Sequence, residues 1–158
     1  MIDLETRAIE LAGIVAAPCE QWVINMVRGL LDQVDGFLMG KRYLILDRDP
    51  VFTRHVRHLL RAAGTDVLRL PSRSPNLNAY AERFIGSVRR ECLSKVIPLG
   101  DRHLRRILRE YVDHYHLERP HQGLDNRLLK PGVAANSRGP VQRHRRLGGV
   151  LNFYSRAA

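Results

Sequence analysis

The sequence predicts an α/β domain with a partly parallel sheet. Short apolar runs of strand length alternate with longer segments whose apolar residues recur at helical spacing. No internal repeat or low-complexity segment interrupts this alternation. With 158 residues, 44% of them hydrophobic, the chain is long enough for one domain with its own core, followed by a tail.

The first elements are a pair of strands and a helix. Residues 9–15 are apolar and partly β-branched, which favours a short strand, and residues 1–4 then form the end of a preceding strand. A helix is predicted from Glu20 to Leu31, because apolar side chains recur there every three or four residues. These are Val23, Met26, Val27, Leu30 and Leu31.

A buried strand and a second helix follow. Residues 42–46 read RYLIL, a nearly continuous apolar run that suits a strand buried on both faces. Asp49 before Pro50 predicts a helix start, since Asp caps free amides and Pro is tolerated at the first helical position. This helix is expected to end near Ala63, before Gly64, and residues 67–70 are expected to form another strand.

The second half of the chain is predicted to be helical. Pro and Ser residues mark a loop at 71–76, and helices are expected over residues 78–93 and 101–116. The apolar face of the last helix comprises Leu104, Ile107, Leu108, Tyr111, Val112 and Tyr115. We expect a core over residues 1–130 and a loosely ordered, basic C-terminal tail over residues 131–158.

The charge balance points to a polyanionic partner. Lys and Arg number 26 against 16 Asp and Glu, a net charge of +10. Nucleic acid is the first candidate, although ribosomal proteins and proteins that bind anionic membranes share such a balance. No apolar run approaches the roughly 20 residues of a membrane span, and no N-terminal leader pattern is visible, so a cytoplasmic location is expected.

Cysteine and histidine give no sign of a zinc site. Cys19 and Cys92 form no CxxC pair and are interpreted as small buried hydrophobic residues. His114, His116 and His121 lack supporting ligands at metal-binding spacing, so we expect them to face solvent or DNA.

Two carboxylates have positions that suit catalysis. Asp47 ends the strand at 42–46, and catalytic groups of α/β sheets gather at the carboxyl ends of strands. Glu82 lies on the helix that follows the Pro- and Ser-containing loop. Together they could hold Mg²⁺, which prefers oxygen ligands. Taken singly, Asp47 also suits a turn or cap and Glu82 a solvated helix face, while Asp49 is better explained as a cap.

Three segments stand out in order along the chain, LILDRDPVF, RLPSRSPNLNAYAERFIGSVRREC and EYVDHYHLERPHQGL. Together they resemble the integrase core of insertion-sequence transposases and retroviral integrases. By this resemblance Asp47 corresponds to the second acidic residue of the family, and Glu82, 35 positions later, to the third, in an N-A-x-x-E setting. Tyr115, Arg119, Pro120 and His121 match a Y-x-x-x-R-P-H segment. The resemblance implies a ribonuclease-H-like fold, a five-stranded mixed sheet flanked by helices.

The first acidic residue of the family has no counterpart in this chain. In the family it lies on the first strand, upstream of a segment similar to residues 2–7. Asp3 is therefore expected to be a hairpin-turn residue, and the sheet to lack its first strand. The chain is therefore expected to be an N-terminally truncated and nearly inactive copy, because loss of one carboxylate weakens metal binding. Three explanations stay open: the protein begins further upstream, the chain is a decayed copy, or another segment supplies the missing strand.

The resemblance implies DNA transposition or integration by metal-dependent phosphodiester cleavage and strand transfer. Mg²⁺ or Mn²⁺ would be the cofactor, held by Asp47 and Glu82, and a homo-oligomer assembled on DNA ends would be the acting form. Arg73, Asn78 and Arg89 are candidate DNA contacts; each could instead be a surface charge or a cap. The alternatives are a non-catalytic DNA-binding transposase remnant and a ribonuclease-H-type nuclease without strand transfer.

Overall fold

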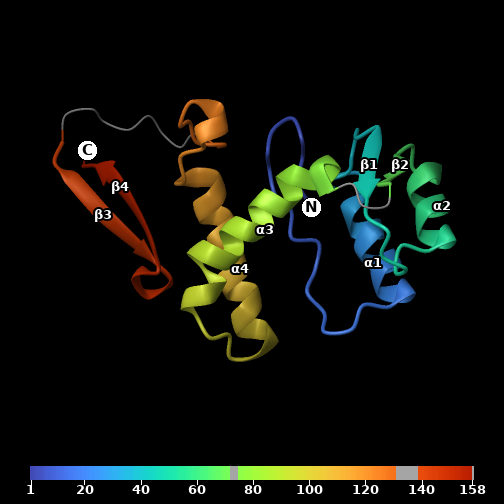
Figure 1. Ribbon diagram of the computed structural model, residues 1–158, viewed down its shortest axis with the longest axis horizontal. Coiled ribbons are helices and arrows are strands. Elements are labelled where there is room, and N and C mark those ends of the chain that lie inside the picture. Colours follow the sequence, from blue (N-terminus) through green and yellow to red (C-terminus); the bar gives the residue numbers. More distant parts are fainter. Residues whose placement is uncertain (72–74, 131–138, 158) are drawn as a thin grey trace. The chain divides into compact units, whose positions relative to one another are not determined.

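The computed structural model describes residues 1–71, 75–130 and 139–157, and confirms a mixed α/β chain of helices and short strands (Figure 1). The chain divides into two compact units. One comprises Glu10–Ala79, and the other joins Met1–Ile9 to Tyr80–Ala158. Each unit has its own buried residues, so the two are described separately.

The unit Glu10–Ala79 contains a strand–helix–strand arrangement. Its elements are α1 (Glu20–Leu30), β1 (Tyr43–Leu46), α2 (Arg54–Ala62), β2 (Asp66–Arg69) and the short 3-10 helix η1 (Pro75–Asn78). Strands β1 and β2 pair in parallel, with Tyr43 opposite Asp66 and Leu46 opposite Arg69. The amide of Leu70 donates to the carbonyl of Leu46 at 3.0 Å and extends this pairing. The predicted parallel pairing is thus confirmed for these two strands.

Apolar side chains of the two helices and the two strands fill this unit. Its buried hydrophobic residues are Val23, Ile24, Val27, Leu30, Leu38, Leu46, Val56, Leu60 and Val67. The expectation that β1 is buried on both faces is wrong at its start, where Tyr43 is 50% exposed. Tyr43 pairs with the exposed Asp66, at the end of the sheet farthest from the buried Leu46.

Helix α2 begins later than the Asp–Pro pair predicted. Its N-cap is Thr53, whose hydroxyl accepts a hydrogen bond from the amide of Val56 at 3.3 Å. Asp49 instead closes a turn, its carboxylate accepting from the amide of Val51 at 2.9 Å. The prediction that Asp49 caps the helix is therefore wrong, because a Thr at the residue before α2 satisfies the free amides directly.

Thr53→Ala is expected to lower the free energy of unfolding by about 1 kcal/mol, the usual value for a lost N-cap. The Thr53 hydroxyl also donates to Glu20 Oε1 at 2.5 Å and so joins α2 to α1. Urea unfolding followed by the fluorescence of Trp22, the one tryptophan of the chain, measures this unit. Thr53→Ser keeps the hydroxyl and should lower the free energy of unfolding much less. An equal decrease in both variants would show that the hydroxyl does not stabilise the start of α2.

The expected strand at residues 9–15 is absent. Ile9 forms one antiparallel bridge with Ile2, and residues 10–15 have no strand partner within the described part of the chain. Gly13 instead meets Trp22 of α1, whose ring lies 2.6 Å from where a Cβ on Gly13 would stand. At Gly13 this run therefore lies against a helix and not beside a strand.

The prediction for Asp3 is confirmed. Its Oδ1 accepts from the amides of Glu5 and Thr6 at 2.9 and 2.8 Å, and thereby closes the turn between Ile2 and Ile9. Such side-chain caps of a turn are a common role of Asp.

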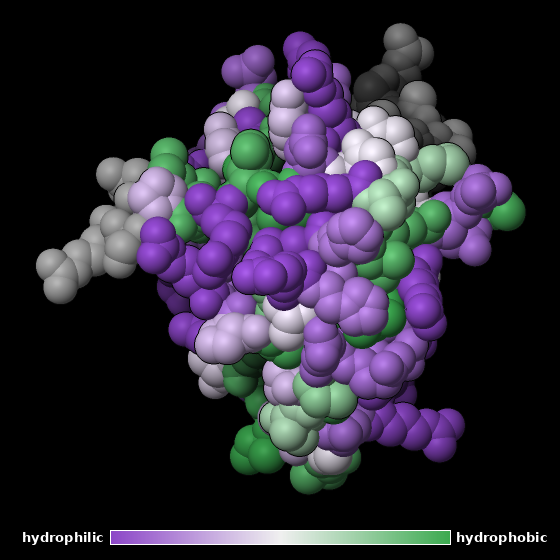
Figure 2. Space-filling model, turned by 90° about the vertical axis from the view of Figure 1, so that its right-hand side faces the viewer, coloured by the Kyte–Doolittle hydropathy of each residue, from purple (hydrophilic) through white to green (hydrophobic). Residues whose placement is uncertain are grey.

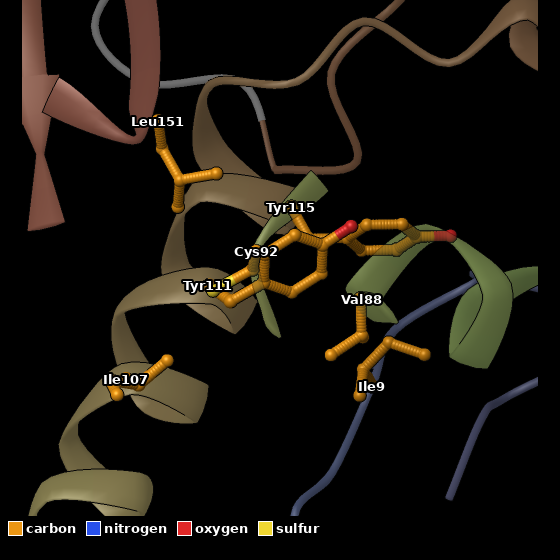
Figure 3. Packing of buried hydrophobic residues seen from close by; sticks show 7 residues of the cluster. All are labelled: Ile9, Val88, Cys92, Ile107, Tyr111, Tyr115 and Leu151. Carbon is orange, nitrogen blue, oxygen red and sulfur yellow. The ribbon is translucent and has the colours of Figure 1, made fainter. Parts of the chain in front are cut away.

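The second unit is built on two long helices and a hairpin. Its elements are α3 (Ala79–Glu91), η2 (Leu93–Lys95), α4 (Gly100–Leu117), η3 (Gln122–Leu124), β3 (Val141–Arg146), η4 (Leu147–Gly149) and β4 (Leu151–Arg156). Helix α3 crosses α4 (Figure 1), and the side chains between them form one hydrophobic cluster. Figure 3 shows its seven buried residues, Ile9, Val88, Cys92, Ile107, Tyr111, Tyr115 and Leu151. The burial of Ile107, Tyr111 and Tyr115 confirms the predicted apolar face of α4.

The end of the chain is not loosely ordered where the structure describes it. Strands β3 and β4 form an antiparallel hairpin, with Val141 opposite Arg156 and Arg146 opposite Leu151. Gly148 and Gly149 in the connection have φ of 67° and 99°, values that favour glycine. Leu151 is buried in the cluster beside α4 and holds the hairpin to this unit. The expectation of a loosely ordered tail is wrong because β3 reads VQRHRR, with one apolar residue, so the sequence shows no strand periodicity there.

Candidate functional site

Asp47 lies at the carboxyl end of β1, as predicted. Its side chain is exposed, and Oδ1 accepts from the amide of Asp49 at 3.1 Å. The next residue, Arg48, donates from Nε to the carbonyl of Leu70 at 3.0 Å, which ties this turn to the end of β2. Asp47 is thus presented at the strand edge where α/β proteins commonly bind ligands.

Glu82 lies in the first turn of α3 and is also exposed. No described residue forms a hydrogen bond or ion pair with its carboxylate. Arg89 is exposed seven residues later, on the same helical face. Arg90, which the sequence analysis did not single out, places Nη1 3.1 Å from where a Cβ on Gly86 would stand. Two arginine side chains therefore lie on or beside the face of α3 that carries Glu82.

The other predicted residues have mixed outcomes. Asn78 is half-buried and ends η1 directly before α3, while Arg73 falls outside the described residues. Asp47 and Glu82 belong to different units, so their meeting at one metal ion remains a prediction. Across residues 1–71, 75–130 and 139–157, no group of three His, Cys, Asp or Glu side chains could hold a metal.

The R-P-H motif has a structural role in this unit. Arg119 makes a two-pronged ion pair with Glu91, the last residue of α3, with Nη2–Oε1 at 2.7 Å and Nε–Oε2 at 3.1 Å. The hydroxyl of Tyr111 donates to the same carboxylate at 2.9 Å. Burial raises the pKa of Glu91, but these hydrogen bonds and the Arg119 charge outweigh it and lower the pKa. The helix that carries Glu82 is thereby fixed to α4 at its C-terminal end.

The three histidines are buried, so the expectation that they face solvent or DNA is wrong. His116 Nε2 accepts from the amide of Ile9 at 2.8 Å, and His121 Nε2 lies 2.8 Å from the carbonyl of Tyr115. Burial lowers the pKa of both His116 and His121, which favours neutral rings. His114 Nδ1 lies 2.9 Å from Glu118 Oε2. The contact of His116 with Ile9 joins residues 107 positions apart, so no local pattern could have revealed it.

Of the two cysteines predicted to be buried, one is buried and the other is exposed. Cys92 is buried in the cluster as predicted, whereas Cys19 is exposed at the N-cap of α1, contrary to expectation. A residue before a helix start lies outside the helix's packing face, which explains the exposure.

An arginine of the N-terminal turn lies beside the start of α3. The guanidinium carbon of Arg7 is 3.7 Å from the ring centroid of Tyr80, and that of Arg83 is 6.0 Å from it. Arg7 has a φ of 62°, an unusual conformation for a residue other than glycine. The turn formed by residues 3–8 is therefore held against the helical turn that carries Glu82.

Basic side chains gather on the exposed face of α2. Helix α2 contains no acidic residue, and its exposed polar side chains are Arg54, His55, His58 and Arg61. Figure 2 views the chain from the side on which α2 lies in Figure 1, and most of this face is hydrophilic. Such faces fit the predicted polyanionic partner.

The comparison with protein families gives a match to the integrase core domain over residues 64–128. This stretch includes Glu82 and the R-P-H motif. Residues 64–128, called the integrase core segment below, are thus similar to that domain. The resemblance stated from the sequence is confirmed here, and it associates the chain with transposition or integration and with DNA as its partner. The searches of curated proteins and of solved structures found no match. In the described part of the chain, no helix has the length and apolar character that crossing a membrane requires.

Proposed function

We propose that this chain forms part of the ribonuclease-H-like catalytic core of a DNA transposase or integrase, which cleaves and joins phosphodiesters with the help of divalent metal. The observation that carries the proposal is the position of Glu82. It lies inside the integrase core segment, on an exposed helical turn whose carboxylate has no partner among the described residues. A partly buried ion pair fixes the same helix at its other end, which supports a defined orientation of this carboxylate.

Two residues of the chain, Asp47 and Glu82, suit part of a magnesium or manganese site. Asp47 and Glu82 offer exposed carboxylate oxygens, the ligand type that these ions prefer. A bound ion would stabilise negative charge on the attacking and leaving oxygens of the phosphodiester. Arg89 would orient a phosphate near Glu82, and Asn78 would contact DNA at the start of the same helix. With only two carboxylates assigned, the chain by itself is expected to cleave DNA poorly.

A non-catalytic DNA-binding remnant is the second candidate. It is favoured by the net charge of +10. The two functions differ in one physical property, because only the catalytic core requires Asp47 and Glu82 to share a metal ion.

Paramagnetic broadening by Mn²⁺ tests this sharing. In the ¹⁵N-labelled chain, we expect low Mn²⁺ concentrations to broaden the amide signals around Asp47 and around Glu82 together. Asp47→Asn should then raise about tenfold the Mn²⁺ concentration that broadens the amide signals around Glu82, because one charged oxygen ligand is lost. The matched control is Asp49→Asn, which changes a carboxylate two residues away that closes a turn.

The control variant should leave the Mn²⁺ response at Glu82 unchanged. Broadening at Glu82 that survives Asp47→Asn would contradict a shared ion and favour the DNA-binding remnant. Broadening confined to Asp47 would do the same.

A further inference from the structure

The hairpin β3–β4 has two faces of different character. Pairing of Arg143 with Tyr154 and of Arg145 with Asn152 places these four residues on one face. Val141 and Arg156 extend the same face at the open end of the hairpin. Except for the half-buried Asn152, all of these residues are exposed.

The opposite face packs on the unit. Leu151 enters the hydrophobic cluster, and Arg146 pairs with Glu118, the residue that follows α4, at 2.6 Å. The rings of His144 and Phe153 stack at 4.6 Å between centroids and 15° between planes. The first face is thus a surface supported from behind by a packed layer.

This surface carries positive charge that no acidic residue of the hairpin neutralises. No acidic residue occurs between Gly139 and Ala157, whereas four arginines do. Glu118 neutralises Arg146, which leaves Arg143, Arg145 and Arg156 on the outward face. Asn152 Oδ1 accepts from Arg143 Nε at 2.9 Å and limits the freedom of that side chain, which lowers the entropy lost when it binds a ligand.

An aromatic ring lies among these charges. Tyr154 is 65% exposed and sits directly opposite Arg143. Exposed rings flanked by arginines are the usual platform for unpaired bases, whose faces stack on the ring while phosphates contact the guanidinium groups. In a duplex the base faces are already stacked on one another, so the ring would gain little there.

We propose that the outward face of β3–β4, comprising Arg143, Arg145, Tyr154 and Arg156, binds single-stranded DNA. Tyr154 stacks on a base, and the arginines contact the phosphates on either side of it. The inference rests on the proposed function for its partner, DNA, but it does not involve Asp47, Glu82 or a metal ion.

Fluorescence anisotropy with a labelled 12-nucleotide oligo(dT) and a 12-base-pair duplex tests the proposal, with EDTA present throughout. Tyr154→Ala should weaken oligo(dT) binding about tenfold and duplex binding less than twofold. Tyr154→Phe keeps the ring and should bind oligo(dT) as the parent does. Arg143→Ala/Arg145→Ala should lower the salt dependence of oligo(dT) binding by about 1.4 in log–log slope, about 0.7 for each phosphate contact.

The matched control is Arg54→Ala/Arg61→Ala, which removes the same charge from the exposed face of α2. It should weaken oligo(dT) binding clearly less than the hairpin double variant. Equal losses in the two double variants, or equal losses of single-stranded and duplex binding in Tyr154→Ala, would overturn the proposal. Asp47→Asn should leave oligo(dT) affinity unchanged, so failure of the shared metal ion and failure of this surface give different results.

Discussion

Replacing Tyr111 by alanine is expected to lower the free energy of unfolding by about 4 kcal/mol, the range for removing a large buried aromatic side chain. Tyr111 is fully buried in the cluster between α3 and α4 (Figure 3). Its ring centroid lies 6.1 Å from that of Phe84 and 6.3 Å from that of Tyr115. Since domains are typically stable by about 5–15 kcal/mol, this loss would remove a large share of the stability of the unit.

Urea unfolding followed by circular dichroism at 222 nm measures the loss. The matched control is Tyr154→Ala, which removes the same side chain from an exposed strand position and should cost less than about 0.5 kcal/mol. Tyr111→Phe removes only the hydrogen bond to Glu91 and should cost about 1 kcal/mol. If Tyr111→Ala proved as mild as Tyr154→Ala, the cluster could not be the core of this unit.

The sequence predicted those features of the fold that depend on neighbours along the chain. Helical periodicity predicted the bounds of α1 and α4 to within a residue or two, and the apolar run before Asp47 predicted β1. Asp3 was assigned to its turn because an Asp side chain caps amides two and three residues ahead. In each case the deciding interactions span at most four residues or one face of one element.

The features that the sequence missed depend on partners far away. The burial of His116 depends on Ile9, 107 positions earlier, and the role of Arg119 depends on Glu91, 28 positions earlier. A basic side chain without a visible partner is reasonably assigned to solvent or DNA, and that assumption failed for the histidines. The hairpin was missed because its apolar residues pack on a helix that the local pattern does not specify.

The candidate site shows the same division. The sequence correctly placed Asp47 at a strand end and Glu82 on an exposed helical turn, since both positions follow from local structure. Whether the two carboxylates meet depends on how the chain brings two separate units together, and no spacing rule contains that information. The fixing of α3 by Arg119 adds a reason, absent from the sequence, for the orientation of Glu82.

Arg146→Ala is expected to lower the free energy of unfolding by about 3 kcal/mol at neutral pH, because it leaves a buried carboxylate without its charge partner. The side chain of Glu118 is 7% exposed and pairs with Arg146 at 2.6 Å. Burial raises the pKa of Glu118, but the hydrogen bonds from Arg146 and His114 outweigh it and lower the pKa. Without Arg146, burial dominates and the pKa should rise instead.

The pH dependence separates this mechanism from a simple loss of packing. A carboxylate with a lowered folded-state pKa stabilises the protein above its unfolded pKa, and this contribution is lost as pH falls through the folded-state value. The difference between parent and Arg146→Ala should therefore be largest at neutral pH, and shrink as pH falls first through the raised pKa of Glu118 in the variant and then through its lowered pKa in the parent. Arg145→Ala, one residue away on the exposed face of the same strand, should change stability by less than about 0.5 kcal/mol at every pH. A loss in Arg146→Ala that stayed constant down to pH 3 would point to lost packing of the arginine stem against α4 and contradict the buried ion pair as its cause.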